Sequence, residues 1–156
     1  MSLEWIEPKT DWQAHYDESG QFTGDYVNVE DYNRIKNNFL YLREYIKKIF
    51  FNPPVITVGV DKHTPENNNP DFDNDNFFAD EWNLIEDALE TLDNHIAVLN
   101  HGDKQTFYEN GAFISYSELN RLEQASLDIY THITDSERQK LHLSFRLGMR
   151  SRAIRP

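Results

Sequence analysis

The sequence predicts a mainly α domain in which three repeated amphipathic helices pack as a small bundle, with short β segments in the loops and at the C-terminus. Two observations predict this fold class: one pattern that occurs three times without gaps, and apolar residues spaced for one face of a helix. The copies are Val29-Glu30-Asp31-Tyr32-Asn33-Arg34-Ile35-Lys36, Ala79-Asp80-Glu81-Trp82-Asn83-Leu84-Ile85-Glu86 and Tyr116-Ser117-Glu118-Leu119-Asn120-Arg121-Leu122-Glu123. Because a repeated helix is an architectural feature, this pattern favours a scaffold over a catalyst.

The apolar stripe stays in register when the copies are aligned on their shared asparagines, Asn33, Asn83 and Asn120. Its steps of three and four residues place the apolar side chains on one face of a helix with 3.6 residues per turn. Asparagine has poor helix propensity, so amphipathicity alone does not explain its recurrence. We expect six stripe residues to be buried together: Ile35, Leu42, Ile85, Leu92, Leu122 and Ile129.

Local signals mark where the helices begin and end. Asn28 stands three residues before Asp31, and Ser115 stands three before Glu118. Such a pair supplies a side-chain oxygen and a returning carboxylate, which satisfy backbone amides at a helix N-terminus. The first helix is expected to end before Asn52-Pro53-Pro54, because proline has no amide donor and disfavours helix in the preceding residue.

The β segments are predicted from composition and alternation. Residues 55–60 form a β-branched run, residues 106–108 lie between turn sequences, and residues 141–147 alternate apolar and polar side chains. Each is predicted to be a short strand. Residues 63–76, rich in Asn, Asp and Pro, read as a loop longer than the usual connection.

The domain organisation is a single domain preceded by an arm. At 156 residues, with 38% hydrophobic and 13% aromatic residues, the chain can bury a real core. Residues 1–25 show no period and are predicted to be an irregular arm, followed by a helical domain with the C-terminal strand and a basic tail over residues 26–156. The arm's Trp5 and Trp12 are expected to pack onto the core or onto a partner.

The charge is distributed unevenly along the chain. Residues 1–136 hold 9 Lys/Arg against 26 Asp/Glu, whereas residues 137–156 hold 6 against 1. A body this acidic repels nucleic acid, and no nucleic-acid motif accompanies the basic tail. The tail is therefore expected to dock on an acidic protein surface, such as a second copy of the chain. Its candidate interaction residues are Leu143, Phe145, Arg146, Arg150, Arg152 and Arg155.

Several function classes find no support in the sequence. No apolar run approaches the length of a membrane span, and the acidic N-terminus lacks the features of a secretory signal, so a soluble chain without a membrane partner is expected. The absence of cysteine removes disulfides and thiol nucleophiles. No nucleophile elbow, phosphate-binding loop or dinucleotide fingerprint occurs, so neither an enzyme nor a cofactor is predicted.

Metal binding is not predicted either. Asp71, Asp73 and Asp75 match the first ligands of an EF-hand loop, but Asn76 stands where glycine is required and Trp82 where the bidentate glutamate is required. The alternative, a solvated acidic loop, is preferred, although calcium binding is left open. His95 and His132 occupy equivalent repeat positions near helix ends and are expected to be structural.

Several short strings resemble one protein family. They are Trp5-x-x-Pro8-Lys9-Thr10-Asp11-Trp12, Asp31-Tyr32-Asn33-Arg34-Ile35-Lys36-Asn37-Asn38, Thr106-Phe107-Tyr108-Glu109-Asn110-Gly111 and Leu143-Ser144-Phe145-Arg146-Leu147-Gly148. Together they resemble structural tail proteins encoded by phages and prophages of Gram-positive bacteria. The resemblance implies an attachment or baseplate element of the virion tail, made in the bacterial cytoplasm.

The function expected from these observations is a non-enzymatic structural component of a phage or prophage tail or baseplate. It would act through contacts with other tail proteins and with copies of itself as a homo-oligomer. A small binding module is the alternative. It would recognise a carbohydrate or peptide on a bacterial surface through the aromatic residues of the arm and the 63–76 loop.

Overall fold

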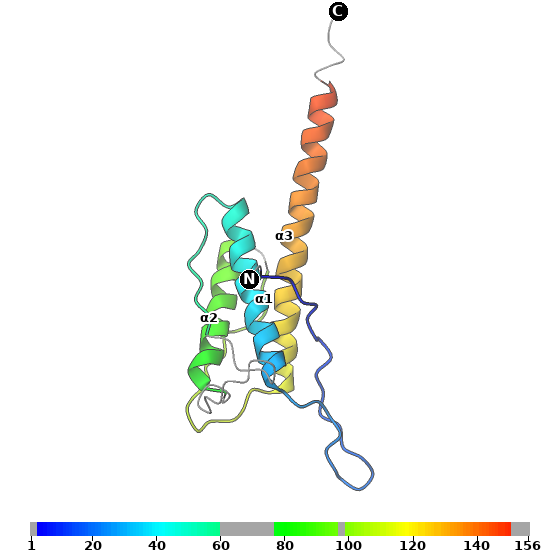
Figure 1. Ribbon diagram of the computed structural model, residues 1–156, viewed down its shortest axis with the longest axis vertical. Helices are drawn as coiled ribbons and strands as arrows, with labels where there is room; N and C mark the ends of the chain where they lie inside the picture. Colours follow the sequence, from blue (N-terminus) through cyan, green and yellow to red (C-terminus); the bar gives the residue numbers. More distant parts are fainter. Residues whose placement is uncertain (1–2, 60–76, 97–98, 151–156) are drawn as a thin grey trace, which may run out of the picture.

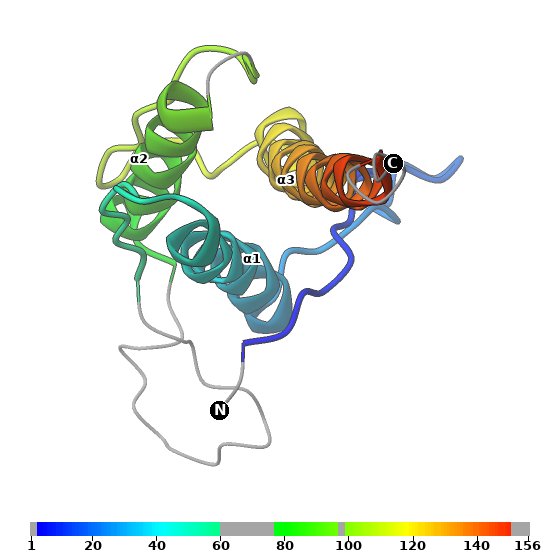
Figure 2. The same cartoon turned by 90° about the horizontal axis from the view of Figure 1, so that it is seen from above.

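The fold is a bundle of three helices, α1 (Val29–Ile49), α2 (Ala79–Ile96) and α3 (Tyr116–Arg150). The computed structural model describes residues 3–59, 77–96 and 99–150, with side chains up to residue 139. Seen from above, the three helices stand at the corners of a triangle, and each contacts the other two (Figure 2). The predicted mainly α class and three-helix bundle are confirmed.

All three helices run in the same direction. In Figure 1 each begins at the lower end of the bundle and ends at the upper end. A helix of 21 residues is about 31 Å long, and about ten extended residues span that distance. The connections from residue 50 to 78 and from 97 to 115 are long enough to return the chain to the lower end before the next helix starts.

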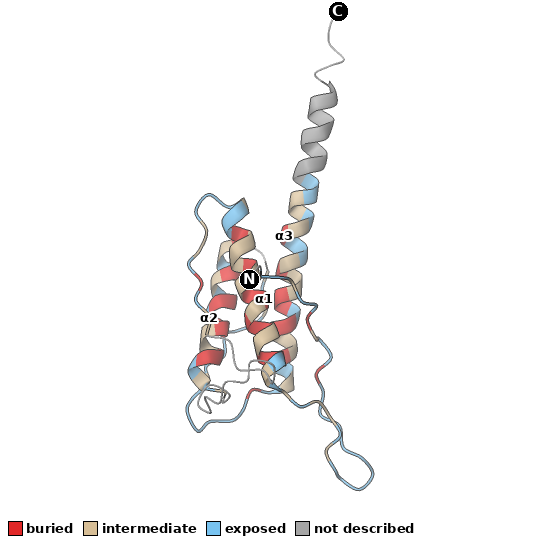
Figure 3. Cartoon of the chain, viewed as in Figure 1, coloured by how far each residue is buried: buried red, intermediate tan, exposed pale blue. Residues whose placement is uncertain are grey.

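The core lies on the inner faces of the helices, where the repeat places it (Figure 3). The predicted core residues are all buried, each with at most 1% of its surface exposed: Ile35, Leu42, Ile85, Leu92, Leu122 and Ile129. They belong to one hydrophobic cluster, which confirms the shared register. Ser126, which interrupts the stripe, is also buried and donates its hydroxyl to the carbonyl of Glu123 (2.8 Å).

The predicted helix starts are present in the structure. Asn28 and Asp31 form a complete capping box at α1. Ser115 accepts a hydrogen bond from the Glu118 amide at α3 (3.3 Å). At α2 the Glu81 carboxylate accepts the amide of Phe78 (3.1 Å). Each cap satisfies backbone donors that the first helical turn leaves without a partner.

The repeated asparagine holds an extended segment against the bundle. Asn120 in α3 bonds both backbone groups of Trp12, accepting its amide (2.8 Å) and donating to its carbonyl (2.9 Å). Asn83 in α2 makes the same pair of bonds to Phe107 (2.8 and 2.9 Å). The segment at Trp12 leads into α1, and the segment at Phe107 leads into α3. These two asparagines therefore replace the strand pairing that an extended segment would otherwise need.

A test of this role is Asn120→Ala. The substitution leaves the amide and carbonyl of Trp12 without their partner, and we expect the free energy of unfolding in urea to fall by about 1–3 kcal/mol. Asn94→Ala is the matched control, because Asn94 is an exposed asparagine in α2. An equal loss in both variants would contradict the proposed role of Asn120.

The predicted strands are not found in the described residues. Residues 55–59 and 106–108 have no regular secondary structure, and residues 141–147 belong to α3. The predicted C-terminal strand is therefore wrong, because an isolated strand leaves its backbone groups unpaired whereas a continued helix satisfies them internally. The arm contains an isolated β-bridge between Tyr16 and Phe22 in a short hairpin.

Candidate functional site

The two arm tryptophans pack against their own bundle. Trp12 is a core residue with 4% of its surface exposed. Trp5 is half-buried and stacks on Tyr130 of α3, with ring centroids 4.2 Å apart. Of the two expectations, core or partner, the contacts agree with packing on the core. The Trp12 ring is therefore not available to a carbohydrate, and one face of the Trp5 ring is covered by Tyr130.

The predicted residues of the tail lie beyond the bundle. Leu143, Phe145, Arg146 and Arg150 fall in the last turns of α3, which extend past the ends of the other two helices (Figure 1). Arg152 and Arg155 lie outside the described residues, as does the acidic run of residues 71–75. The structure thus places the basic end of α3 away from the bundle.

His95 and His132, the two histidines predicted to be structural, belong to no metal-ligand cluster of described residues. His95 packs its ring against Phe50, with centroids 4.9 Å apart, and His132 is exposed. Within the part of the chain that the structure describes, no three His, Cys, Asp or Glu side chains are arranged to hold a metal ion.

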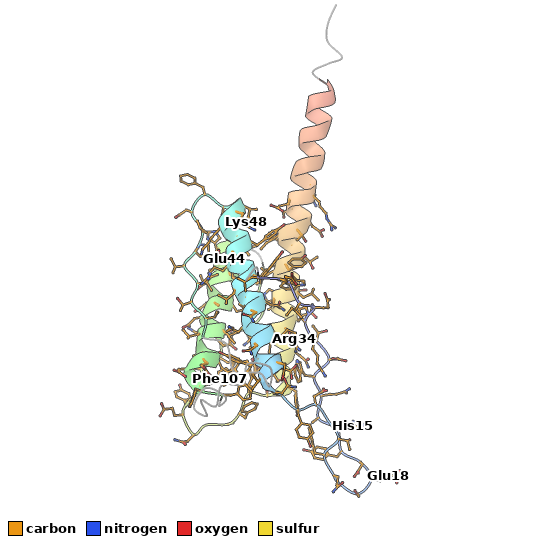
Figure 4. All side chains as sticks on the ribbon, viewed as in Figure 1. His15, Glu18, Arg34, Glu44, Lys48 and Phe107 are labelled. Carbon is orange, nitrogen blue, oxygen red and sulfur yellow. The ribbon has the colours of Figure 1, made fainter. Side chains whose placement is uncertain are left out.

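Two buried ion pairs join neighbouring helices at equivalent repeat positions. Arg34 of α1 bonds Glu123 of α3 (2.6 Å), and Arg121 of α3 bonds Glu86 of α2. Figure 4 labels Arg34 on the side of α1 that faces α3. Glu86 and Glu123 are each 1% exposed. Burial raises the pKa of both carboxyl groups, and the facing arginines only partly offset that rise.

The third interface lacks this pair. The position of Arg34 and Arg121 is occupied in α2 by Leu84, and the position of Glu86 and Glu123 is occupied in α1 by Lys36. The Arg–Glu pairing therefore cannot be repeated between α2 and α1. These polar groups are positioned by one another and by the bundle, so they are structural and form no open reaction site.

A groove lies at the lower end of the bundle, where the helices begin. It has a volume of about 660 Å³ and is formed by the start of α2 and the loop before α3. We call it the aromatic groove. Its lining residues are Phe77–Asp80, Trp82, Asn83 and Phe107–Ile114. Phe107, labelled in Figure 4, lies at this end of the bundle.

The wall of the aromatic groove is built by local contacts. Asn83 holds Phe107 in place through its two backbone hydrogen bonds. After Phe107 the chain turns, with the Gly111 amide donating to the carbonyl of Tyr108 (2.9 Å) and a φ of 59° at Asn110. Asparagine tolerates this left-handed conformation better than most residues. The turn brings Phe113 back against Phe77, with centroids 6.0 Å apart.

The aromatic groove exposes apolar rings beside negative charge. Phe78, Tyr108 and Phe113 are 46%, 73% and 57% exposed. The charged residues in its lining are Asp80 and Glu109, and the lining contains no Lys, Arg or His. Such a surface disfavours anions and accepts apolar or cationic groups.

A second hollow adjoins the first. It has a volume of about 450 Å³ and shares Phe113 and Ile114 with the aromatic groove. On its other side lies the arm hairpin, where Phe22 packs edge to face against Tyr26, itself 72% exposed. The lower end of the bundle therefore carries a continuous display of aromatic residues.

The sequence does not predict the aromatic groove. It predicts a short strand at residues 106–108, next to the turn at Asn110-Gly111. A signal was available in the aromatic residues that flank both the start of α2 and the turn. Their convergence depends on the parallel course of the helices, which was not predicted.

The arrangement offers exposed rings and carboxylates to a binding partner. None of the described helices is both long and apolar enough to span a membrane. Comparison with protein-family models, curated proteins and solved structures gives no match for this chain.

Proposed function

We propose that this protein is a non-enzymatic structural component of a phage or prophage tail or baseplate. It is made in the bacterial cytoplasm and joins the virion tail through contacts with other tail proteins and with further copies of itself. The resemblance of its short strings supports the phage assignment. The observation that carries the assembly role is the extension of α3 beyond the bundle.

The extension begins where α1 ends. In the register of the repeat, Ile49 corresponds to residue 136 of α3. Tyr45, in the last turn of α1, donates a hydrogen bond to Glu137, and this bond raises the pKa of the tyrosine to about 12. Residues 138–150 then continue for roughly 20 Å past the other two helices. An isolated helix of this length is marginal in water and is stabilised by packing on a partner.

The amino-acid composition of the C-terminal residues supports a protein partner. Residues 141–156 contain Arg146, Arg150, Arg152 and Arg155 among apolar residues and have no acidic residue. The remainder of the chain is strongly acidic. Opposite charge speeds encounter and fixes orientation, whereas the apolar residues supply most of the affinity.

The experiment is deletion of residues 141–156. We expect the full chain to self-associate, or to bind a co-expressed neighbouring tail protein, more weakly as salt is raised. The deletion should abolish this association but lower the free energy of unfolding by less than about 1 kcal/mol, since the deleted turns extend past the bundle. Sedimentation velocity over a range of salt and protein concentrations measures the association. Urea unfolding measures the free energy of unfolding.

The matched control replaces the four arginines of the tail with glutamine and keeps its length. Exposed ion pairs contribute about 0–1 kcal/mol each, so this variant should retain part of the association and lose most of its salt dependence. A full chain that remains monomeric at high concentration and binds no co-expressed tail protein would contradict the assembly role. Neighbouring genes that encode other tail proteins would support the phage assignment independently.

A small binding module for carbohydrate or peptide is a second candidate, and the aromatic groove favours it. Exposed Tyr108 and Phe113 beside Asn110 and Asp80 combine stacking surfaces with hydrogen-bonding groups, as a sugar site requires. This site differs from the one expected in the sequence, since Trp5 and Trp12 pack on the bundle. Titration with cell-wall oligosaccharides, followed by tryptophan fluorescence, tests it.

A further inference from the structure

We infer that the aromatic groove of one copy receives the basic C-terminal segment, residues 141–156, of another copy. This inference rests on the proposed function, because it names the surface to which the extension of α3 binds. It would make the assembly directional, with the upper end of one molecule seated on the lower end of the next.

The chemistry of the aromatic groove suits an arginine-rich segment. Asp80 and Glu109 supply negative charge without a competing cation in the lining, and Tyr108 and Phe113 expose ring faces. An arginine can stack on such a ring while its guanidinium pairs with a carboxylate. The same molecule already uses this contact internally, since Arg34 lies over the ring of Trp12, 5.8 Å from its centroid.

The segment has complementary chemistry. Residues 141–156 carry four arginines, no acidic residue, and apolar side chains at Leu143, Phe145 and Leu147. Apolar side chains can fill a hollow of about 660 Å³ while neighbouring arginines meet its carboxylates. A neutral or acidic segment would lack this charge complementarity with Asp80 and Glu109.

The geometry requires a second molecule. The aromatic groove lies at the end of the bundle where the helices begin, and α3 carries Arg150 beyond the opposite end (Figure 1). Residues 141–150 therefore lead away from the groove of their own chain. A contact between unlike ends is heterologous, and it closes into a ring or continues as a filament.

The experiment is a charge exchange in the full chain. Asp80→Lys with Glu109→Lys should weaken self-association roughly tenfold or more, because the groove then repels the basic segment. A second variant replaces Arg146, Arg150, Arg152 and Arg155 with glutamate and should also fail to self-associate. Mixing the two variants should restore association, which sedimentation velocity detects. Far-ultraviolet circular dichroism of each variant confirms that the bundle is folded.

The matched controls lie on the arm hairpin, outside the lining of the groove. Glu18→Lys changes charge at an exposed site, and Tyr16→Ser removes a ring that is 64% exposed. Tyr108→Ser with Phe113→Ser removes the ring faces of the groove. We expect the hairpin variants to associate as the unaltered chain does, and the groove variant to associate about tenfold more weakly.

The outcomes separate the inference from the proposed function. If deletion of residues 141–156 abolishes association but the groove variants associate normally, the segment docks elsewhere and the inference is wrong, while the proposed function stands. If the deletion has no effect, the proposed function itself is contradicted. A cell-wall oligosaccharide that binds the full chain and is lost in the groove variants, with self-association unchanged, would assign the groove to a sugar and overturn the inference.

Discussion

Replacing Arg34 with methionine is expected to lower the free energy of unfolding by about 3–5 kcal/mol. Arg34 bonds Glu123, which is 1% exposed, and it also pairs with Asp31 (2.7 Å). Methionine keeps most of the aliphatic volume over Trp12 but removes the charge. Glu123 is then left ionised in a buried site, or must bind a proton, and either result destabilises the bundle.

A double-mutant cycle adds two further variants, Glu123→Met alone and Glu123→Met combined with Arg34→Met. Removing both partners eliminates the buried charge, so the double variant should be more stable than the Arg34→Met single variant. Urea unfolding of the four proteins gives the coupling energy between the two residues. A double variant whose loss equals the sum of the single losses would show that Arg34 stabilises the fold through packing and its pair with Asp31.

The contribution of Glu123 to the stability of the fold changes with pH in a predictable direction. The folded-state pKa of Glu123 is raised by burial, so the folded protein binds the proton more tightly than the unfolded chain does. The stabilisation from this tighter proton binding is fully present below the pKa of Glu123 in the unfolded chain. It is lost as the pH rises through the pKa of Glu123 in the folded protein. We therefore expect the stability deficit of Arg34→Met to be smaller near pH 4 than at pH 7, as measured by urea unfolding at the two pH values.

Leu122→Ala is expected to lower the free energy of unfolding by about 2–5 kcal/mol. Leu122 is fully buried where the inner faces of the three helices meet. The substitution loses the transfer free energy of the removed atoms and leaves a cavity that the close-packed neighbours fill only partly. Urea unfolding measures the loss, and circular dichroism tests whether helix content is retained.

Leu127→Ala is the matched control for this prediction. Leu127 is one and a half turns further along α3 and only half-buried. Since less apolar surface returns to water and little cavity remains, its loss should be clearly smaller. Equal losses at the two positions would contradict the inner-stripe register that the repeat predicts.

The helices and the core can be predicted from the sequence. The spacing of apolar residues required one buried face per helix, and the signals at Asn28 and Ser115 located two of the helix starts. These features depend on interactions within a few residues of each other. Burial of the six stripe residues followed because a repeated pattern places equivalent side chains at equivalent depths.

The predicted strands do not form in the residues that the structure describes, because their signals were also local. Residues 106–108 have strand composition, but Asn83 of α2 supplies the hydrogen bonds that a partner strand would have supplied. Residues 141–147 alternate as a strand does, but the helix that begins at Tyr116 continues through them. Alternation indicates a strand only where a second strand is available to pair with it.

The direction of the helices and the position of the candidate site depend on tertiary packing. Antiparallel and parallel bundles bury the same stripe, so the stripe could not distinguish them. The parallel course sets Asn120 beside Trp12, Asn83 beside Phe107, and the aromatic residues of two loops at one end of the bundle. The aromatic groove exists because segments distant in sequence return to the same end, and no local pattern encodes that return.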